Sequence, residues 1–159
     1  MIRQFRAICR IKELREEKLQ RAVEVKRRDI REAEQAHIEA EHRARENELR
    51  MIEREKAIYA RLLGKVSSPA RFERAKAKVR ALEEEQQGLV EVVRAAQQAI
   101  KRLNEELEVL REEHRSATID RDKYHTTKRK LELELRMAAE AAEEVDLEEL
   151  SISKFASAQ

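Results

Sequence analysis

Residues 64–69 constrain the fold most, because they contain the only proline and one of only two glycines in 159 residues. A glycine suits the left-handed position just past a helix, and Ser68 followed by Pro69 suits the start of one. One long helix is therefore expected to end near Gly64 and another to begin after Ser68. A connection of about four or five residues joins antiparallel neighbours, so the segment predicts a helical hairpin. The alternative is a kink in one continuous helix that dimerises in parallel.

The composition indicates how such helices pack. Charged residues make up 43% of the chain, aromatic residues 3%, and tryptophan is absent. These proportions are typical of a coiled coil and leave no room for an enzyme pocket, so no enzymatic activity is expected. The predicted fold is all-α, a long antiparallel two-helix coiled-coil hairpin that is monomeric on its own. Arm one covers residues 2–63, the turn 64–69, arm two 70–145, and a flexible acidic, Ser/Ala-rich tail 146–159.

The N-terminus and the single cysteine favour a cytoplasmic protein. Residues 1–6 lack the apolar stretch of a signal peptide, and the longest apolar run in the chain is too short to span a membrane. Cys9 has no partner for an internal disulfide, which suits a reducing compartment.

Apolar residues recur every three or four positions along both arms and predict the line of contact between them, here called the seam. In arm one the seam positions are Ile2, Phe5, Cys9, Lys12, Glu16, Leu19, Val23, Lys26, Ile30, Ala33, His37, Ala40, Ala44, Asn47, Met51, Arg54, Ile58 and Arg61. In arm two they are Phe72, Ala75, Val79, Leu82, Gln86, Leu89, Val93, Ala96, Ile100, Leu103, Leu107, Leu110, His114, Ala117, Arg121, Tyr124, Lys128, Leu131, Leu135 and Ala138. Eleven of the eighteen positions are apolar in arm one and sixteen of the twenty in arm two, so arm two is the stronger half.

Several apolar residues of arm one lie off the seam. They are Ile8, Ile11 and Leu14 near the start, and Leu49, Ile52, Tyr59 and Leu63 near the turn. Either the seam shifts its register there, or these side chains are exposed for a partner.

Folding at about residue 66 places positions opposite each other when their numbers add up to about 133, and leaves roughly 15 to 20 residues of arm two extending past arm one. This pairing sets Lys26 and the two arginines after it against the acidic residues around Glu106, and residues 83–85 against arginines that include Arg54. Residues 1–31 carry a net charge of +6 and residues 131–159 a net charge of −6. Opposite charges at the two ends favour the hairpin over a parallel dimer.

Like charges gather at the open end of the hairpin in a group here called the basic collar. Its members are Arg3, Arg6, Arg10, Lys12, Arg15, Lys128, Arg129 and Lys130. No carboxylate of the opposite arm is expected to neutralise these cations fully. The alternative is that the acidic tail folds back on them.

No residue pattern indicates catalysis, a cofactor or a metal site. His37 and His42 lie on different helical faces, while His114 and His125 share a face without a further ligand. His114 lies on the seam, where a polar residue sets the register. The chain has no phosphate-binding loop and no aromatic stacking platform, and its cations are interleaved with carboxylates that repel nucleic acid.

Residues 5–19, Phe-Arg-Ala-Ile-Cys-Arg-Ile-Lys-Glu-Leu-Arg-Glu-Glu-Lys-Leu, and the basic, alanine-containing heptads up to Ala44 resemble the opening of the YscO/FliJ family. These are the central stalk proteins of type III secretion systems. The length, the single break at the midpoint and the two long arms are similar as well. The resemblance rests on an apolar and basic pattern that covers nearly the whole chain.

The resemblance implies a non-enzymatic antiparallel coiled coil similar to that of the gamma subunit of rotary ATP synthases. It implies three partners: a hexameric secretion ATPase that holds the stalk in its pore, an export gate, and some secretion chaperones. Such a stalk lies at the cytoplasmic face of the apparatus and reaches the membrane only through these partners. By analogy the basic collar faces the ATPase. The residues near the turn that would face the export gate are Tyr59, Leu62, Leu63 and Phe72.

Other functions fit the pattern less closely. A generic coiled-coil scaffold or tether would share the hairpin without contacting an ATPase. A nucleic-acid-binding helical arm would need salt-dependent binding to RNA. A prefoldin-type chaperone would need strands that this sequence does not predict.

Overall fold

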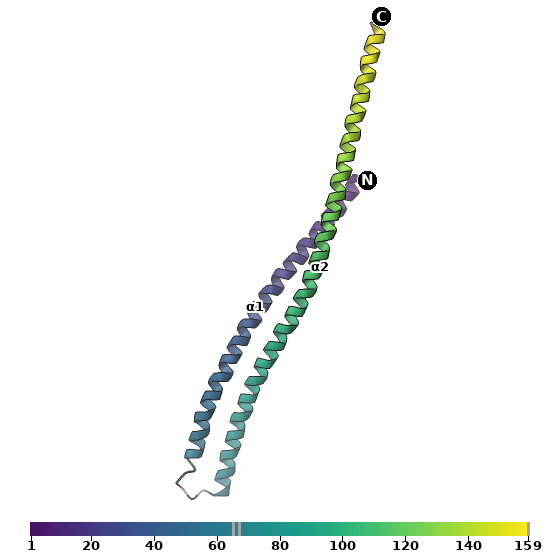
Figure 1. Cartoon of the computed structure of the whole chain (residues 1–159). Coiled ribbons are helices and arrows are strands. Elements are labelled where there is room, and N and C mark those ends of the chain that lie inside the picture. Colours follow the sequence, from purple (N-terminus) through teal and green to yellow (C-terminus); the bar gives the residue numbers. More distant parts are fainter. Residues whose placement is uncertain (65, 67, 159) are drawn as a thin grey trace. The chain divides into compact units, whose positions relative to one another are not determined.

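The computed structural model describes residues 1–64, 66 and 68–158, in which two α-helices form a hairpin (Figure 1). Helix α1 spans Ile2–Ala60 and helix α2 spans Pro69–Ser157. No strand occurs in the described ranges. The all-α prediction is confirmed. Lys65 and Ser67 of the predicted turn, and Gln159 of the predicted tail, lie outside the described residues.

Helix α1 ends three residues earlier than the sequence suggests. Its last helical residue is Ala60, and residues 61–64 form a tighter turn in which the Leu62 amide donates to the Tyr59 carbonyl oxygen at 3.0 Å. Gly64 then adopts the left-handed conformation, with φ at 81°. A three-residue hydrogen bond of this kind is common where an α-helix terminates. Gly64 therefore has the predicted conformation, at the end of the turn that follows the helix.

Helix α2 begins as the Ser-Pro pair predicts. The Ser68 carbonyl oxygen accepts hydrogen bonds from the amides of Arg71 at 3.0 Å and Phe72 at 3.3 Å. Pro69 is the first helical residue, where its missing N–H costs nothing.

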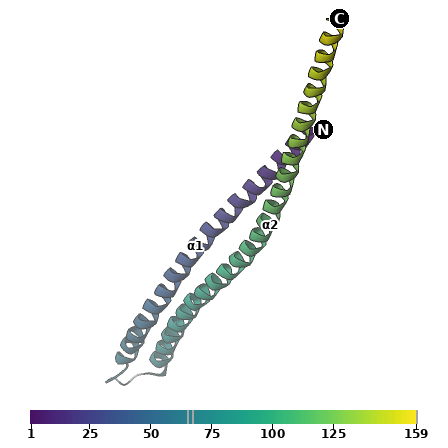
Figure 2. The same cartoon turned by 45° about the horizontal axis from the view of Figure 1, so that its top comes forward.

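Contacts divide the chain into two compact units. The open-end unit contains Met1–Val23 and Leu110–Gln159, and the turn unit contains Glu24–Val109. Within each unit α1 and α2 lie side by side in both views (Figures 1 and 2).

Every residue that is buried in the described structure occupies a predicted seam position. These residues are Cys9, Glu16, Val23, Ile30, Ala40, Ala44, Ala75, Val79, Leu82, Leu107 and Ala117. Each unit thus has a narrow core formed by one line of residues from each helix, as expected for two-stranded packing.

The off-seam apolar residues of arm one are exposed, so the alternative of a register shift is wrong. Ile11 is 62% exposed in the open-end unit. In the turn unit, Leu49 is 68% and Leu63 77% exposed. The buried residues of α1, from Cys9 to Ala44, all keep the predicted register.

Helix α2 continues to Ser157, beyond the boundary expected at residue 145. Residues 146–157 contain no proline or glycine, and their leucine and glutamate residues favour a helix. All described residues from 133 to 158 are exposed. The predicted flexibility of this segment stays a prediction.

Candidate protein-interaction surfaces

Contacts between the helices bring both parts of the basic collar into one stretch of the open-end unit. The Arg6 guanidinium donates to Glu132 Oε1 at 3.0 Å, and the Cys9 thiol donates to the Tyr124 carbonyl oxygen at 3.6 Å. The ring of Phe5 lies 5.8 Å from that of Tyr124. Residues 3–12 therefore run beside residues 120–132, which is the pairing that the sequence predicts.

Three members of the collar have carboxylate partners. Their ion pairs are Arg6–Glu132 at 3.0 Å, Arg10–Glu13 at 3.1 Å and Lys12–Asp120 at 3.2 Å. The expectation that the opposite arm does not neutralise the collar is wrong for Arg6 and Lys12, while Arg10 is paired by Glu13 of its own helix. Glu132 and Asp120 both lie on α2. Whether they meet cations of α1 depends on the exact pairing of the two helices, which the sequence predicts only to within a few residues.

The other five members form no ion pair within the described part of the chain: Arg3, Arg15, Lys128, Arg129 and Lys130. Lys128 is half-buried and the other four are exposed. Because α2 is helical without a break to Ser157, its acidic end does not fold back over them. The collar thus presents uncompensated positive charge to solvent.

A polar cluster lies within the core of the open-end unit. The carboxylate of Glu16, a residue only 8% exposed, lies 2.7 Å from His114 Nε2 and 3.2 Å from the Arg121 guanidinium. The sequence places all three on the seam but does not show that they meet, although their positions nearly satisfy the pairing rule. A buried polar contact of this kind fixes register, because a shift would leave a buried charge unpaired.

A second histidine contact lies beside this cluster. His125 Nε2 is 2.7 Å from Glu13 Oε1, and Glu13 also accepts a hydrogen bond from Arg10. The hydrogen bond from Arg10, with the charge of His125, holds the pKa of Glu13 below its ordinary value, although desolvation opposes the shift. Glu13 and Glu16 are thus the main carboxylates that α1 directs at cations of α2 here.

The turn unit presents an apolar strip, formed by Ile52, Tyr59 and Leu63, at the end of α1 and in the turn that follows it. Tyr59, Leu63 and Ile52 line one shallow hollow together with Lys56. Tyr59 is 37% exposed and Leu63 77% exposed. Of the four predicted residues near the turn, these two share one surface.

The remaining two predicted residues lie elsewhere. Leu62 lines a pocket between the helices, while Phe72 of α2 is 47% exposed, with Lys76 Nζ 5.0 Å from its ring centroid. The structure therefore does not gather all four predicted residues into one patch.

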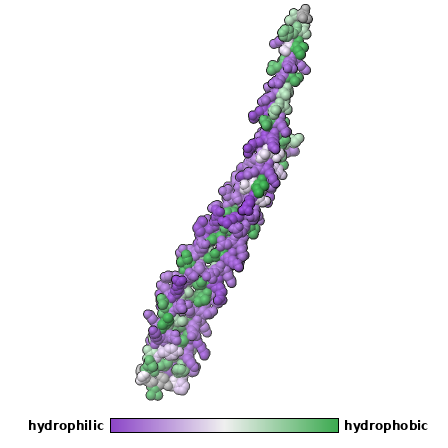
Figure 3. All heavy atoms as spheres, in the orientation of Figure 1, coloured by the Kyte–Doolittle hydropathy of each residue, from purple (hydrophilic) through white to green (hydrophobic). Residues whose placement is uncertain are grey.

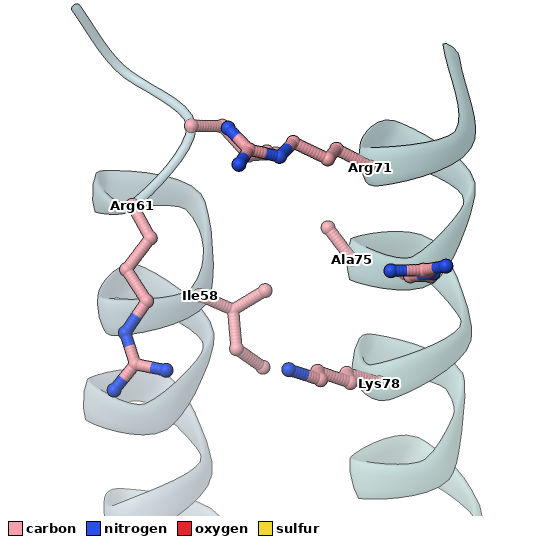
Figure 4. Close-up of a pocket in the computed structure, with 7 residues that line it drawn as sticks. Ile58, Arg61, Arg71, Ala75 and Lys78 are labelled. Atoms are coloured by element: carbon pink, nitrogen blue, oxygen red, sulfur yellow. The ribbon is translucent and has the colours of Figure 1, made fainter. Parts of the chain in front are cut away.

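The pocket between the helices has a basic rim that sequence reasoning missed. Its volume is about 320 Å³, and its lining residues are Ile58, Arg61, Leu62, Arg71, Arg74, Ala75 and Lys78. In Figure 4, Ile58 of α1 and Lys78 of α2 point toward each other, and Arg71 extends from α2 toward α1. The available signal was the run of cations at positions 61, 71, 74 and 78, which the pairing rule sets near one another. The turn unit thus offers positive charge beside its apolar strip.

Hydrophobic residues also reach the surface at the end of α2. On the face in Figure 3 they are visible over the turn and along the last part of α2. Neither described helix has a segment long and apolar enough to cross a membrane. No group of three or more His, Cys, Asp or Glu in the described ranges is placed to hold a metal ion.

Comparison with protein families matches residues 5–152 to the family described as Type III secretion protein YscO. The match covers most of both helices and the segment that joins them. No curated protein and no solved structure matches the chain.

Proposed function

The chain belongs to the YscO family of type III secretion proteins, and on this basis we propose that it is the non-enzymatic central stalk of an export apparatus. In this proposal the open-end unit inserts into the pore of a hexameric secretion ATPase. The turn unit contacts the export gate at the cytoplasmic face of the apparatus. Secretion chaperones are further candidate partners.

The uncompensated cations of the collar are the observation that supports the ATPase contact. Of the eight collar residues, five have no carboxylate partner within the described structure: Arg3 and Arg15 on α1, and Lys128, Arg129 and Lys130 on α2. A pore lined by acidic loops would supply the missing charges. Such contacts speed association and set orientation without burying much apolar surface, and they weaken as salt is added.

Charge reversal at the unpaired cations tests this proposal. The triple variant Arg3→Glu, Arg129→Glu, Lys130→Glu, all at exposed positions, should weaken binding to the ATPase and its stimulation by tenfold or more, which is about 1.4 kcal/mol or more. Helix content and melting temperature should not change, because these side chains make no ion pairs in the described structure. Binding is measured at low and high salt together with ATP hydrolysis.

The matched control carries the same change of charge in the turn unit. Arg28, Arg31 and Arg43 are exposed and form no ion pair among the described residues. Reversing these three to Glu should leave ATPase stimulation near its original value. Equal losses in both variants would indicate an unspecific charge effect. Full stimulation by the collar variant would show that the ATPase binds another surface, or that the protein is a scaffold without an ATPase contact.

A second pair of changes tests the contact with the export gate. Tyr59→Ala combined with Leu63→Ala removes two exposed side chains of the same hollow. This variant should bind the ATPase normally but bind the cytoplasmic domain of the gate less tightly. Normal binding to the gate would contradict the assignment of the apolar strip.

A further inference from the structure

The spacing of the seam continues along α2 past the contacts with α1. Among the described residues, Glu132 is the furthest along α2 with an ion pair to α1, formed with Arg6. Beyond it, the same alternation of three and four residues falls on Leu135, Ala138, Ala142, Val145, Glu149 and Ile152. Five of these six are apolar.

These seam residues are exposed although they continue the line that is buried elsewhere in the unit. Leu135 is 54%, Val145 53% and Ile152 67% exposed. In the same unit, Ala117 on the same line is 5% exposed. These seam positions therefore form the face of α2 on which a second helix would continue the packing that α1 and α2 make elsewhere in the unit.

Three of the six positions that flank this face between residues 133 and 153 are acidic, and none of the six is basic. Glu134, Asp146 and Glu148 each lie next to a seam position, and none forms an ion pair within the described structure. Glu132 follows the seam residue Leu131 as Asp146 follows Val145, and it forms an ion pair with Arg6 of α1. In two-stranded packing these flanking positions select the partner by charge.

We propose that residues 133–152 of α2 form a docking face for a basic amphipathic helix of another protein. The partner helix would set apolar side chains against the continued seam and lysines or arginines against its acidic flanks. The match to the YscO family runs through residue 152 and so includes this face. The inference goes beyond the proposed function and does not depend on the ATPase contact.

A second copy of this chain is a poorer occupant of the face. Residues 131–159 carry eight acidic and two basic side chains, so two such segments side by side would repel each other. A foreign basic helix removes this repulsion. Twenty helical residues are about 30 Å long, enough for roughly five turns of contact.

Binding of two synthetic helices to the full chain tests the proposal. One 21-residue peptide carries leucine and isoleucine at the seam spacing with lysine at the flanking positions, and the other is identical except for glutamate at those positions. Calorimetry should show binding of the lysine peptide that weakens with salt, and at least tenfold weaker binding of the glutamate peptide. No binding of the lysine peptide, or equal binding of both peptides, would overturn the proposal.

Two matched variants locate the contact. Val145→Asn with Ile152→Asn changes the continued seam, whereas Met137→Asn with Leu147→Asn changes residues of similar exposure off it, at 60% and 65%. The first pair should reduce binding of the lysine peptide at least tenfold, while the second should change it by less than threefold. Equal loss in both would mean that the peptide binds a general apolar surface and not the seam.

Sedimentation of the chain alone decides between the two occupants. The proposal expects a monomer. A dimer that dissociates on the Val145→Asn, Ile152→Asn substitution would show that a second copy covers the face, and would overturn the proposal.

Discussion

Leu107 and Val109 lie two residues apart on α2 but differ sharply in burial, with exposed fractions of 5% and 59%. Leu107→Ala should lower the free energy of unfolding by about 2 to 3 kcal/mol, the low end for buried leucines, because a two-stranded core encloses a side chain incompletely. Val109→Ala should change it by less than about 0.5 kcal/mol. Urea unfolding followed by circular dichroism measures both. Equal effects would contradict the seam.

The ion pair of Lys26 and Glu106 predicts a dependence on pH. Lys26 Nζ lies 2.6 Å from Glu106 Oε2, and its hydrogen bond holds the pKa of Glu106 below the ordinary value of 4.5. The folded state then binds the proton of Glu106 less readily than the unfolded state. The stability from this pair is present above pH 4.5 and is lost as pH falls through the lowered pKa.

Glu106→Gln should therefore reduce the loss of melting temperature that the native chain shows on acidification from about pH 5 to about pH 3. The effect is small because the pair is exposed to solvent. Exposed Glu105→Gln, next in sequence, is the control and should leave the acid dependence nearly unchanged. Identical acid profiles for the native chain and Glu106→Gln would show that the pair contributes nothing in solution.

At the scale of the helices, substitution of the two glycines by alanine should have opposite effects on stability. Gly64 has a φ of 81°, while Gly88 lies within α2, and an added Cβ would meet no atom within 4 Å at either position. Gly64→Ala should destabilise the hairpin by about 1 to 2 kcal/mol through backbone strain. Gly88→Ala should stabilise it by about 0.5 to 1 kcal/mol through helix propensity. Thermal unfolding distinguishes them, and a stabilising Gly64→Ala would contradict the left-handed turn.

The start of α2 could be predicted from sequence and its end could not. Ser68 and Pro69 act through local hydrogen bonding and a fixed φ, so their effect is readable without tertiary structure. The end of α2 has no such signal, because residues 146–157 contain no glycine or proline. Helix ends without a strong cap depend on fraying and propensity, which periodicity does not report.

At the scale of the whole chain, the seam was predictable because its spacing repeats over many turns, so single polar residues do not obscure it. The pairing of individual charges was not predictable to the same degree. Whether Arg6 meets Glu132 depends on a pairing offset of a few residues and on side-chain rotamers, and neither is encoded in a periodic pattern. The sequence therefore does not predict which cations of the basic collar remain unpaired.

The hairpin requires that α1 pairs with α2 of the same chain. In the turn unit, the side-chain amide of Asn47 donates to Gln86 Oε1 at 2.8 Å, and Gln86 donates to the Ala44 carbonyl oxygen at 3.2 Å. Replacing Asn47 and Gln86 with cysteine, in a chain carrying Cys9→Ala, sets two thiols at this contact. Treatment with a short bismaleimide, followed by denaturing electrophoresis and mass spectrometry, then reports which thiols are joined. The hairpin predicts a link within one chain at monomer mass, whereas linked dimers joined through position 47 of both chains would establish the parallel alternative.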